Sequence, residues 1–410
     1  MIQQKKYYPW LLVALLWGVG LLNYLDRQML STMRPAIQVD IHELRSATNF
    51  GLLMGIFLWI YGLMSPVAGA VADRVNRKWL IVGSLLVWSG VTFGMGYART
   101  FHELYLLRAV MGISEALYIP AALALIAEFH PKKTRSLAIG IHMTGLYLGS
   151  ALGGFGATVA ASYSWHFTFH TFGLMGIGYA FILILFLREN PERFSLHAQN
   201  RSLDKPKIGK AISVLFSNMA FWIILMYFAV PSLPGWATKN WLPTLFAHHL
   251  NMPMSQAGPL STMTIAISSF AGVILGGFVS DRWVLTNIRG RIFTSAIGLS
   301  LTIPGLLFMG FGHSLIVLVA AGICFGLGFG IFDANNMPIL CQFVAPKYRA
   351  TAYGLMNMVG VFFAAFITDL LGRSTDGGHL GRDFALLSII VLAALITQLW
   401  TLKPTVNDFK

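Results

Sequence analysis

Two pairs of ionisable side chains stand out among those inside the long apolar stretches of this 410-residue sequence. Asp26 and Arg27 are neighbours in one stretch, and Arg108 and Glu115 stand seven residues apart in another. Seven residues in a helix place two side chains on one face, about 10 Å apart along the axis. Burial favours the protonated form of a carboxyl group, whereas a nearby arginine favours the ionised form. Such a group could couple the binding of a proton to the binding of an anion.

The elements that carry these charges are predicted to cross a membrane. Apolar residues make up 56% of the chain and charged residues 11%, and the mean hydropathy is +0.66. A soluble protein has about 25% charged residues. The apolar runs are about 20 residues long, the length of a helix that crosses the hydrocarbon core of a bilayer. Because the runs are continuous rather than alternating, they indicate helices and not barrel strands.

We predict twelve spans, at residues 10–32, 49–72, 79–98, 103–129, 135–160, 167–187, 216–246, 258–280, 292–311, 315–341, 348–371 and 384–402. The polar segment 188–215 is interpreted as a linker between an N-terminal bundle (1–187) and a C-terminal bundle (216–410). Pro231, Pro234 and Gly235 predict a break near the outer end of the seventh span. Glycines in the spans 135–160 and 315–341 predict close helix contacts.

The distribution of positive charge predicts the orientation in the membrane. An even number of spans places both chain ends on one side. Of the 29 lysines and arginines, 21 fall in the termini, the linker and the loops after spans 2, 4, 8 and 10, and five fall in the other loops. Positive residues are enriched on the cytoplasmic side. Both termini are therefore predicted to be cytoplasmic, and the net charge of +13 needs no nucleic-acid partner.

A short motif recurs at equivalent places in the two halves. Gly69-Ala-Val-Ala-Asp73-Arg74 follows span 2, with Arg77 close behind, and Gly277-Phe-Val-Ser-Asp281-Arg282 follows span 8. With this loop signature the chain resembles the major facilitator superfamily. The resemblance implies an all-α membrane protein of two pseudo-symmetric six-helix bundles around a cavity that opens alternately to each side. It also implies that Asp73, Arg74, Arg77, Asp281 and Arg282 control the conformation at the cytoplasmic face.

Further segments resemble the anion:cation symporter branch of that superfamily, which includes hexuronate and galactonate carriers. They are Asn23 to Arg27, Arg108 to Pro120, Trp241-Leu-Pro243 and Gly354-Leu-Met-Asn357. The resemblance implies that Asp26 and Glu115 handle protons and that Arg27 and Arg108 serve the anion. It also implies substrate contacts from Tyr24, Tyr61 and Asn357. Ser65 replaces a glutamine common in sugar-acid carriers, Lys239 beside the span-7 tryptophan is unusual, and spinster-like carriers share the same charged pattern.

Structural interpretations stand beside these functional ones. Asp26–Arg27 or Arg108–Glu115 could be static pairs, but four charges in the membrane favour a functional site. Asp333 is either a gate or a pair partner. Lys239 is an outer-gate cation or, as we favour slightly, an interfacial lysine that snorkels to the membrane surface. His142 is either a proton relay or, as we favour, a hydrogen-bonded helix histidine.

We therefore predict a secondary active transporter that couples symport of protons to a small organic anion, such as a sugar acid or similar carboxylate. The alternative is a spinster-like or multidrug-like transporter of an amphipathic lipid or drug. We expect no enzymatic activity, because no nucleophile motif, metal-ligand spacing or phosphate-binding loop is present. We expect no cofactor or metal, with the proton as coupling ion, and a monomer in the lipid bilayer of a bacterial inner membrane.

Overall fold

The computed structural model describes residues 7–189, 208–345 and 348–403. Its N-terminal helices are α1 (Tyr8–Ile37), η1 (His42–Arg45), α2 (Ala47–Arg74), α3 (Arg77–Met95), α4 (Phe101–Ala116), α5 (Tyr118–Phe129), α6 (Lys132–Gly153), α7 (Gly156–Ser162) and α8 (Trp165–Phe186). Its C-terminal helices are α10 (Ile208–Phe216), α11 (Met219–Leu250), α12 (Met254–Trp283), α13 (Gly290–Phe311), α14 (Leu315–Asp333), α15 (Asn336–Phe343), α16 (Arg349–Asp376) and α17 (Leu380–Thr401).

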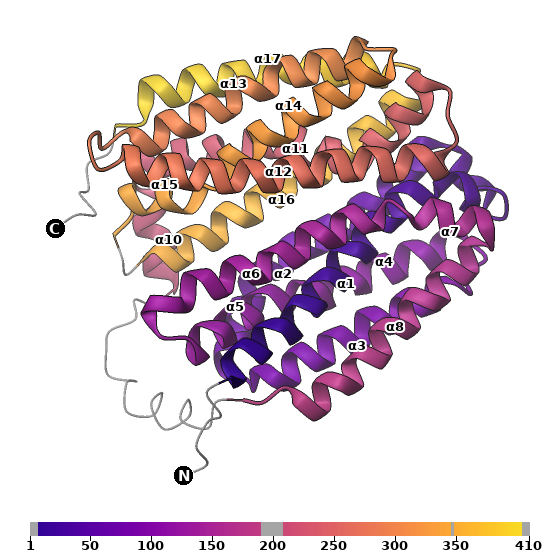
Figure 1. The fold of residues 1–410 in the computed structure, drawn as a ribbon, viewed down its shortest axis with the longest axis horizontal. Helices are drawn as coiled ribbons and strands as arrows, with labels where there is room; N and C mark the ends of the chain where they lie inside the picture. The colour runs from indigo at the N-terminus through magenta and orange to yellow at the C-terminus, as the bar shows by residue number, and fades with distance from the viewer. Residues whose placement is uncertain (1–6, 190–207, 346–347, 404–410) are drawn as a thin grey trace.

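These helices supply twelve stretches long and apolar enough to cross a bilayer within the described residues. The all-α membrane fold predicted from the sequence is confirmed. Figure 1 shows α1–α8 gathered in one bundle and α11–α17 in another. The last part of the predicted linker is helical, because α10 covers Ile208–Phe216, and residues 190–207 of that linker lie outside the described part.

Three of the spans consist of two helices each. The fourth is α4 followed by α5, the fifth is α6 followed by α7, and the tenth is α14 followed by α15. Pro120 and Pro338 have no N–H to bond the carbonyls of Ala116 and Ala334, which lie at the first and third interruptions. The second interruption falls at Gly154, where glycine tolerates a change of direction.

The predicted break in the seventh span is wrong. Helix α11 runs unbroken from Met219 to Leu250 with three prolines inside it. The hydroxyl of Ser232 donates to the carbonyl of Phe228 at 2.8 Å, and the hydroxyl of Thr238 donates to that of Pro234 at 3.0 Å. These two carbonyls are not the ones that the prolines leave without a donor. The carbonyl of Lys239, which Pro243 cannot bond, accepts instead from the Gln28 amide of α1 at 2.6 Å, and neighbouring helices can satisfy backbone groups near a membrane proline in this way.

Small residues bring helices into contact inside each bundle. A Cβ at Gly149 of α6 would lie 2.2 Å from the carbonyl oxygen of Leu21 in α1, and one at Gly330 of α14 would lie 2.1 Å from that of Ser269 in α12. Close backbone approach of this kind is how glycine supports helix packing in membranes. Gly140, by contrast, faces open space, so the predicted close contact is wrong at that glycine.

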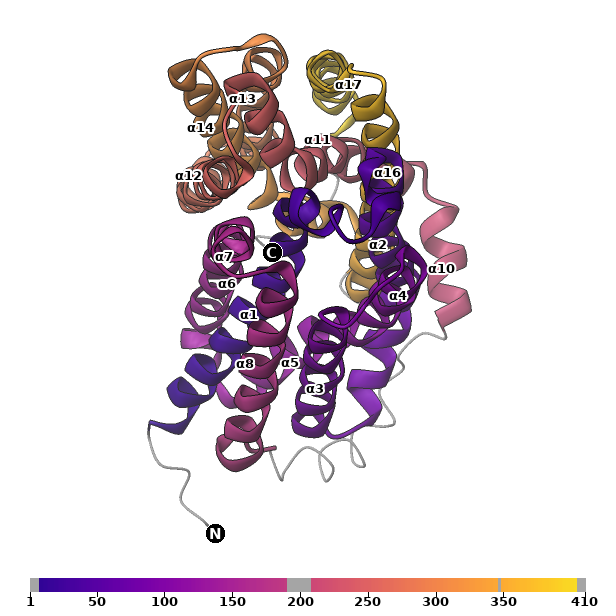
Figure 2. The same cartoon turned by 90° about the vertical axis from the view of Figure 1, so that its right-hand side faces the viewer.

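Several contacts join the two bundles near the ends of helices that lie away from the chain termini. Thr158 donates to the Ser255 carbonyl at 2.6 Å, and Thr262 donates to the Ala151 carbonyl at 3.0 Å. In Figure 1 the two bundles converge toward this end. Figure 2, which views that end, shows α2 beside α16 and α7 beside α12. The two bundles are therefore in contact at the end opposite the termini, which we call the distal end.

Candidate functional site

Helices α1 and α4 place an ion pair inside the N-terminal bundle. Nε of Arg27 lies 2.5 Å from Oε2 of Glu115. The Arg27 side chain is 9% exposed and the Glu115 side chain 0% exposed, so the pair is sealed from solvent. Removing two charges from water is costly, and their attraction offsets that cost only when the contact is close. In this conformation the positive charge of Arg27 is therefore neutralised by the Glu115 carboxylate.

Asp26 and Arg108 lie outside this pair. The Thr92 hydroxyl of α3 donates to Oδ2 of Asp26 at 3.2 Å. Nη1 of Arg108 lies 3.0 Å from the sulfur of Met111, one turn along α4. Both side chains are buried, at 5% and 3% exposure. The static pairs considered from the sequence, Asp26–Arg27 and Arg108–Glu115, do not form among the described ion pairs. Successive helix residues diverge by about 100°, and seven residues separate two groups by about 10 Å.

An aromatic side chain that the sequence analysis missed connects the two arginines. The ring of Phe57 in α2 lies 4.9 Å from Cζ of Arg27 and 4.5 Å from Cζ of Arg108. The ring of Tyr61, one turn further along α2, lies 4.6 Å from Cζ of Arg27. An arginine over an aromatic face is attracted by the ring quadrupole. The spacing of Phe57 and Tyr61 on one helix face is the signal that could have identified this contact.

Asp26, Arg27, Arg108 and Glu115 form a charged cluster, and part of its hydrogen-bonding capacity is unused. Nη2 of Arg27, Nε of Arg108 and Oε1 of Glu115 are buried and have no hydrogen-bond partner among the described residues. Buried polar atoms without partners are rare, because each costs free energy. Buried charged groups with spare donors and acceptors are typical of a site that exchanges partners during function.

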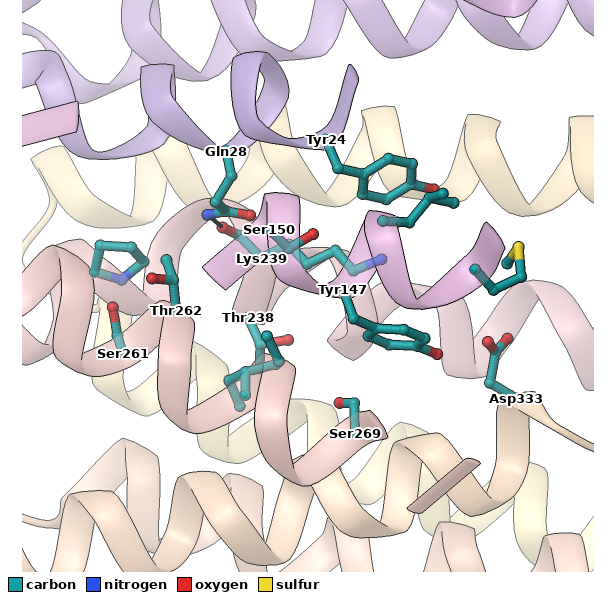
Figure 3. A pocket seen from close by; sticks show the side chains of 15 residues that line it. Tyr24, Gln28, Tyr147, Ser150, Thr238, Lys239, Ser261, Thr262, Ser269 and Asp333 are labelled. Carbon is teal, nitrogen blue, oxygen red and sulfur yellow. Dashed lines mark hydrogen bonds between the residues drawn. The ribbon is translucent and has the colours of Figure 1, made fainter. Parts of the chain in front are cut away.

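A pocket opens between the bundles beside this cluster (Figure 3). It is bordered by residues of both bundles, namely Tyr24, Gln28, Met143, Leu146, Tyr147, Ser150, Thr238, Lys239, Pro243, Ser261, Thr262, Ile265, Ala266, Ser269 and Asp333. Of the substrate contacts predicted from the sequence, Tyr24 borders the pocket, whereas Arg27, Arg108, Tyr61 and Asn357 do not. Tyr24 connects the pocket with the charged cluster, because its ring also lies 4.9 Å from Cζ of Arg27.

Two charged residues border this pocket among those described. Nζ of Lys239 lies 4.7 Å from the centre of the Trp236 ring, and the amide of Asn336 donates to Oδ1 of Asp333 at 3.0 Å. The structure places Lys239 toward the pocket between the bundles, which differs from the favoured interpretation as an interfacial lysine. Polar neighbours such as Gln28, Tyr147 and Ser269 were not singled out from the sequence, because their side chains resemble ordinary span residues.

His142 of α6 is fully buried and its ring lies 5.9 Å from that of Tyr118. Its ring nitrogens make no hydrogen bond of normal geometry among the described residues, and its role as a proton relay or as a hydrogen-bonded helix histidine stays a prediction. The Tyr118 hydroxyl instead donates to the neighbouring carbonyl of Leu16 at 2.7 Å. Asn357 is half-buried in α16.

The residues of the repeated motif lie at the ends of helices. Arg77 is buried and pairs with Glu128 of α5, in the same bundle. Arg74 is exposed, and the side chain of Asp73 lies outside what the structure describes. In the second copy, Asp281 lies 3.8 Å from Nη2 of Arg291, and Cζ of Arg282 lies 4.0 Å from the Phe278 ring. The two ion pairs each join two helices of the same bundle, whereas the Arg282–Phe278 contact lies within α12.

Known proteins resemble the chain over nearly its whole length. Residues 16–368 match the sequence profile of the Major Facilitator Superfamily. The uncharacterized transporter YybO of Bacillus subtilis is 25% identical over 98% of this chain and 95% of its own. Human protein spinster homolog 1 is 27% identical over 95% of this chain and 78% of its own. The hexuronate transporter of B. subtilis is 26% identical over 70% of this chain and 68% of its own.

A solved structure has the same fold. It is a bacterial homolog of the human lysosomal transporter Spinster in an inward-facing and occupied conformation. Its TM-score is 0.78 with 20% sequence identity, and the match covers 96% of this chain and 97% of that one. The comparison supports the arrangement of helices described above.

Proposed function

The chain belongs to the major facilitator superfamily, and from that premise we propose that it couples symport of protons to a small organic anion. The substrate class is a sugar acid or a similar carboxylate, and transport proceeds by alternating access. The likeness to a hexuronate transporter supports this class. The twelve apolar helices make it a multi-pass membrane protein. We place it in a bacterial inner membrane, as a monomer with both termini in the cytoplasm, with the proton as coupling ion and no cofactor.

The observation that carries this proposal is the buried Arg27–Glu115 pair. Together with Asp26 and Arg108 it forms a group of two carboxylates and two guanidiniums, whose formal charges sum to zero when all are ionised. Taking up one proton leaves one excess positive charge in a site sealed from water. An excess charge is costly there, and binding of one anion offsets it. Proton and anion therefore favour each other's binding, and this coupling is reciprocal.

Tyr24 lies between the substrate pocket and the Arg27–Glu115 pair, which takes up the proton. Its side chain borders the pocket, and its ring lies 4.9 Å from the guanidinium carbon of Arg27. An anion in the pocket attracts Arg27 away from Glu115. The carboxylate that loses its partner then takes a proton more readily. Because residues of both bundles line the pocket, an anion bound there biases which end of the protein is closed.

A second candidate is a spinster-like transporter of an amphipathic molecule. Met143, Leu146 and Ile265 give the pocket an apolar wall, and human protein spinster homolog 1 is similar over 95% of this chain. A lipid or drug with an apolar tail would cover these apolar side chains, whereas a sugar acid would use the polar side chains of the same lining. The two candidates therefore differ in which pocket side chains they require.

The test is uptake into proteoliposomes of radiolabelled hexuronates, aldonates and lysolipids, with and without an inward proton gradient. Uptake of one acid driven by the gradient, lost in Arg108→Ala and uncoupled in Glu115→Gln, would support proton–anion symport. Asp383→Asn is the matched control, because its carboxylate pairs with the neighbouring Arg382 in α17 and does not border the pocket. Movement of lysolipid without movement of any acid would overturn the sugar-acid proposal in favour of the second candidate.

A further inference from the structure

The pocket between the bundles carries its own pair of opposite charges, separate from the Arg27–Glu115 cluster. Lys239 and Asp333 are the charged residues among the described pocket lining, and both belong to the C-terminal bundle. They form no ion pair within 4.0 Å among the described residues. In Figure 3 they lie on different sides of Tyr147. The pocket thus carries one positive and one negative side chain that are not in direct contact.

Lys239 is positioned as a ligand rather than as a surface lysine. Its ammonium stands over the Trp236 ring at 4.7 Å, which restricts the side chain on one side. The Gln28 amide of α1 donates to the Lys239 backbone carbonyl at 2.6 Å, so the residue is anchored to the opposite bundle. Arg27, in contrast, is already paired at 2.5 Å and does not border the pocket.

The side chains available to a ligand are uncharged hydroxyls. Thr238, Ser261 and Thr262 donate to backbone carbonyls, so their protons are already used. Tyr24, Tyr147, Ser150 and Ser269 also border the pocket, and their hydroxyls take part in none of the hydrogen bonds found among the described residues. Free hydroxyls beside a cation fit a molecule that combines a carboxylate with hydroxyl groups.

Asp333 determines how many charges that molecule can carry. One of its oxygens accepts from Asn336 at 3.0 Å, and the carboxylate faces the pocket. A hydroxyl at this end of a ligand can donate to it, whereas a second carboxylate would be repelled. Specificity in proteins often depends on such a repulsive element. An ionised Asp333 therefore selects against dianions.

Building on the proposed function, we infer that Lys239 binds the substrate carboxylate directly and that Asp333 restricts the substrate to hydroxylated monoanions. The roles of the two bundles then differ. The N-terminal bundle holds the proton switch, and the C-terminal bundle holds the determinants of substrate charge and orientation.

The experiment measures binding of gluconate and glucarate to the full-length protein in nanodiscs by isothermal calorimetry. These open-chain acids match except at one end, where a hydroxymethyl group in gluconate is a second carboxylate in glucarate. We expect the wild type to bind gluconate at least tenfold more tightly than glucarate. Lys239→Gln should weaken the binding of gluconate at least tenfold, and Lys239→Arg should retain most of the affinity for gluconate. Asp333→Asn should bring the two acids within about threefold, since the repelling charge is gone.

Asp383→Asn again removes a carboxylate outside the pocket and should leave both affinities unchanged. Unchanged gluconate affinity in Lys239→Gln, or an unchanged ratio of the two acids in Asp333→Asn, would overturn the inference while leaving proton-driven uptake intact. Equal binding of the acids by the wild type would also overturn it. If the wild type neither binds nor transports any acid, the proposed function fails together with the inference. Lys239→Arg and Asp333→Asn keep the test decisive should Lys239→Gln fail to fold.

Discussion

Asp376, in the last turn of α16, accepts two hydrogen bonds from Thr48 in α2, one from its backbone N–H at 2.9 Å and one from its hydroxyl at 2.7 Å. The same carboxylate accepts from the Ala47 N–H and the Ser46 hydroxyl, each at 2.7 Å. An acidic side chain of one bundle thus caps the first turn of a helix in the other, where the free N–H groups favour a negative charge. This contact holds the distal end closed.

Asp376→Ala should shift the protein toward the conformation that is open at the distal end. The lost contacts are exposed, so we expect a total of about 1.4 kcal/mol, or a tenfold change in the ratio of conformations. The measurement is alkylation of a cysteine at Ser150, in the pocket, by an impermeant maleimide added from the distal side. Cys324 and Cys341 would first be replaced by serine.

Asp383→Ala is the control for that measurement, because Asp383 pairs with its own neighbour Arg382 in α17. We expect its labelling rate to match the wild type. Equal labelling of the Asp376 and Asp383 variants would show that the cap contributes nothing to closure.

Gly154→Ala should prevent the distal end from closing. A Cβ at this position would lie 2.0 Å from the Thr262 hydroxyl and 2.8 Å from the carbonyl oxygen of Gly258, in the other bundle. Backbone cannot yield as a flexible side chain can, so the bundles must separate. We expect faster labelling at Ser150 from the distal side and slower substrate exchange. Gly140→Ala, where the added methyl group meets open space, should leave both rates unchanged, and similar behaviour of the two variants would argue against a steric effect.

Much of the fold follows from the sequence because a bilayer limits the choices. Twelve apolar runs of sufficient length predict twelve spans, and the structure confirms them. The positions of helix breaks are harder to predict. Pro120 and Pro338 stand at interruptions, whereas the three prolines of α11 lie inside a continuous helix. The difference depends on packing partners, which become neighbours only after folding.

The site could be predicted in composition but not in pairing. Asp26, Arg27, Arg108 and Glu115 are recognisable because charges in apolar runs are costly. Which carboxylate meets which guanidinium depends on the rotation of each helix about its axis, and a difference of one residue changes the facing direction by about 100°. Asp376 gives no such signal, because an acid near a helix end resembles an ordinary surface residue.

Phe57→Leu should destabilise the protein more than an ordinary core substitution of the same size. Its ring lies within 4.9 Å of both guanidinium carbons, so the change removes two cation–π contacts at once. Desolvated contacts of this kind contribute about 2 kcal/mol each. Phe384→Leu is the control, because Phe384, at 0% exposure, is as deeply buried as Phe57, at 2%, and lies in the C-terminal bundle. A larger loss of apparent Tm for Phe57→Leu is expected, and equal losses would mean that the ring only fills space.

The Arg27–Glu115 pair should show strong coupling in a double-mutant cycle. Arg27→Met leaves the Glu115 carboxylate buried without its partner, and Glu115→Leu does the same to Arg27. Breaking one side of a buried pair costs about 3–5 kcal/mol, whereas replacing both sides by apolar groups is often nearly neutral. Each single variant should therefore have a lower apparent Tm in detergent than the double variant. Transport distinguishes this result from a structural role, because the stable double variant should have lost its response to the proton gradient. A double variant as unstable as the two single changes added together would show that the two residues act independently.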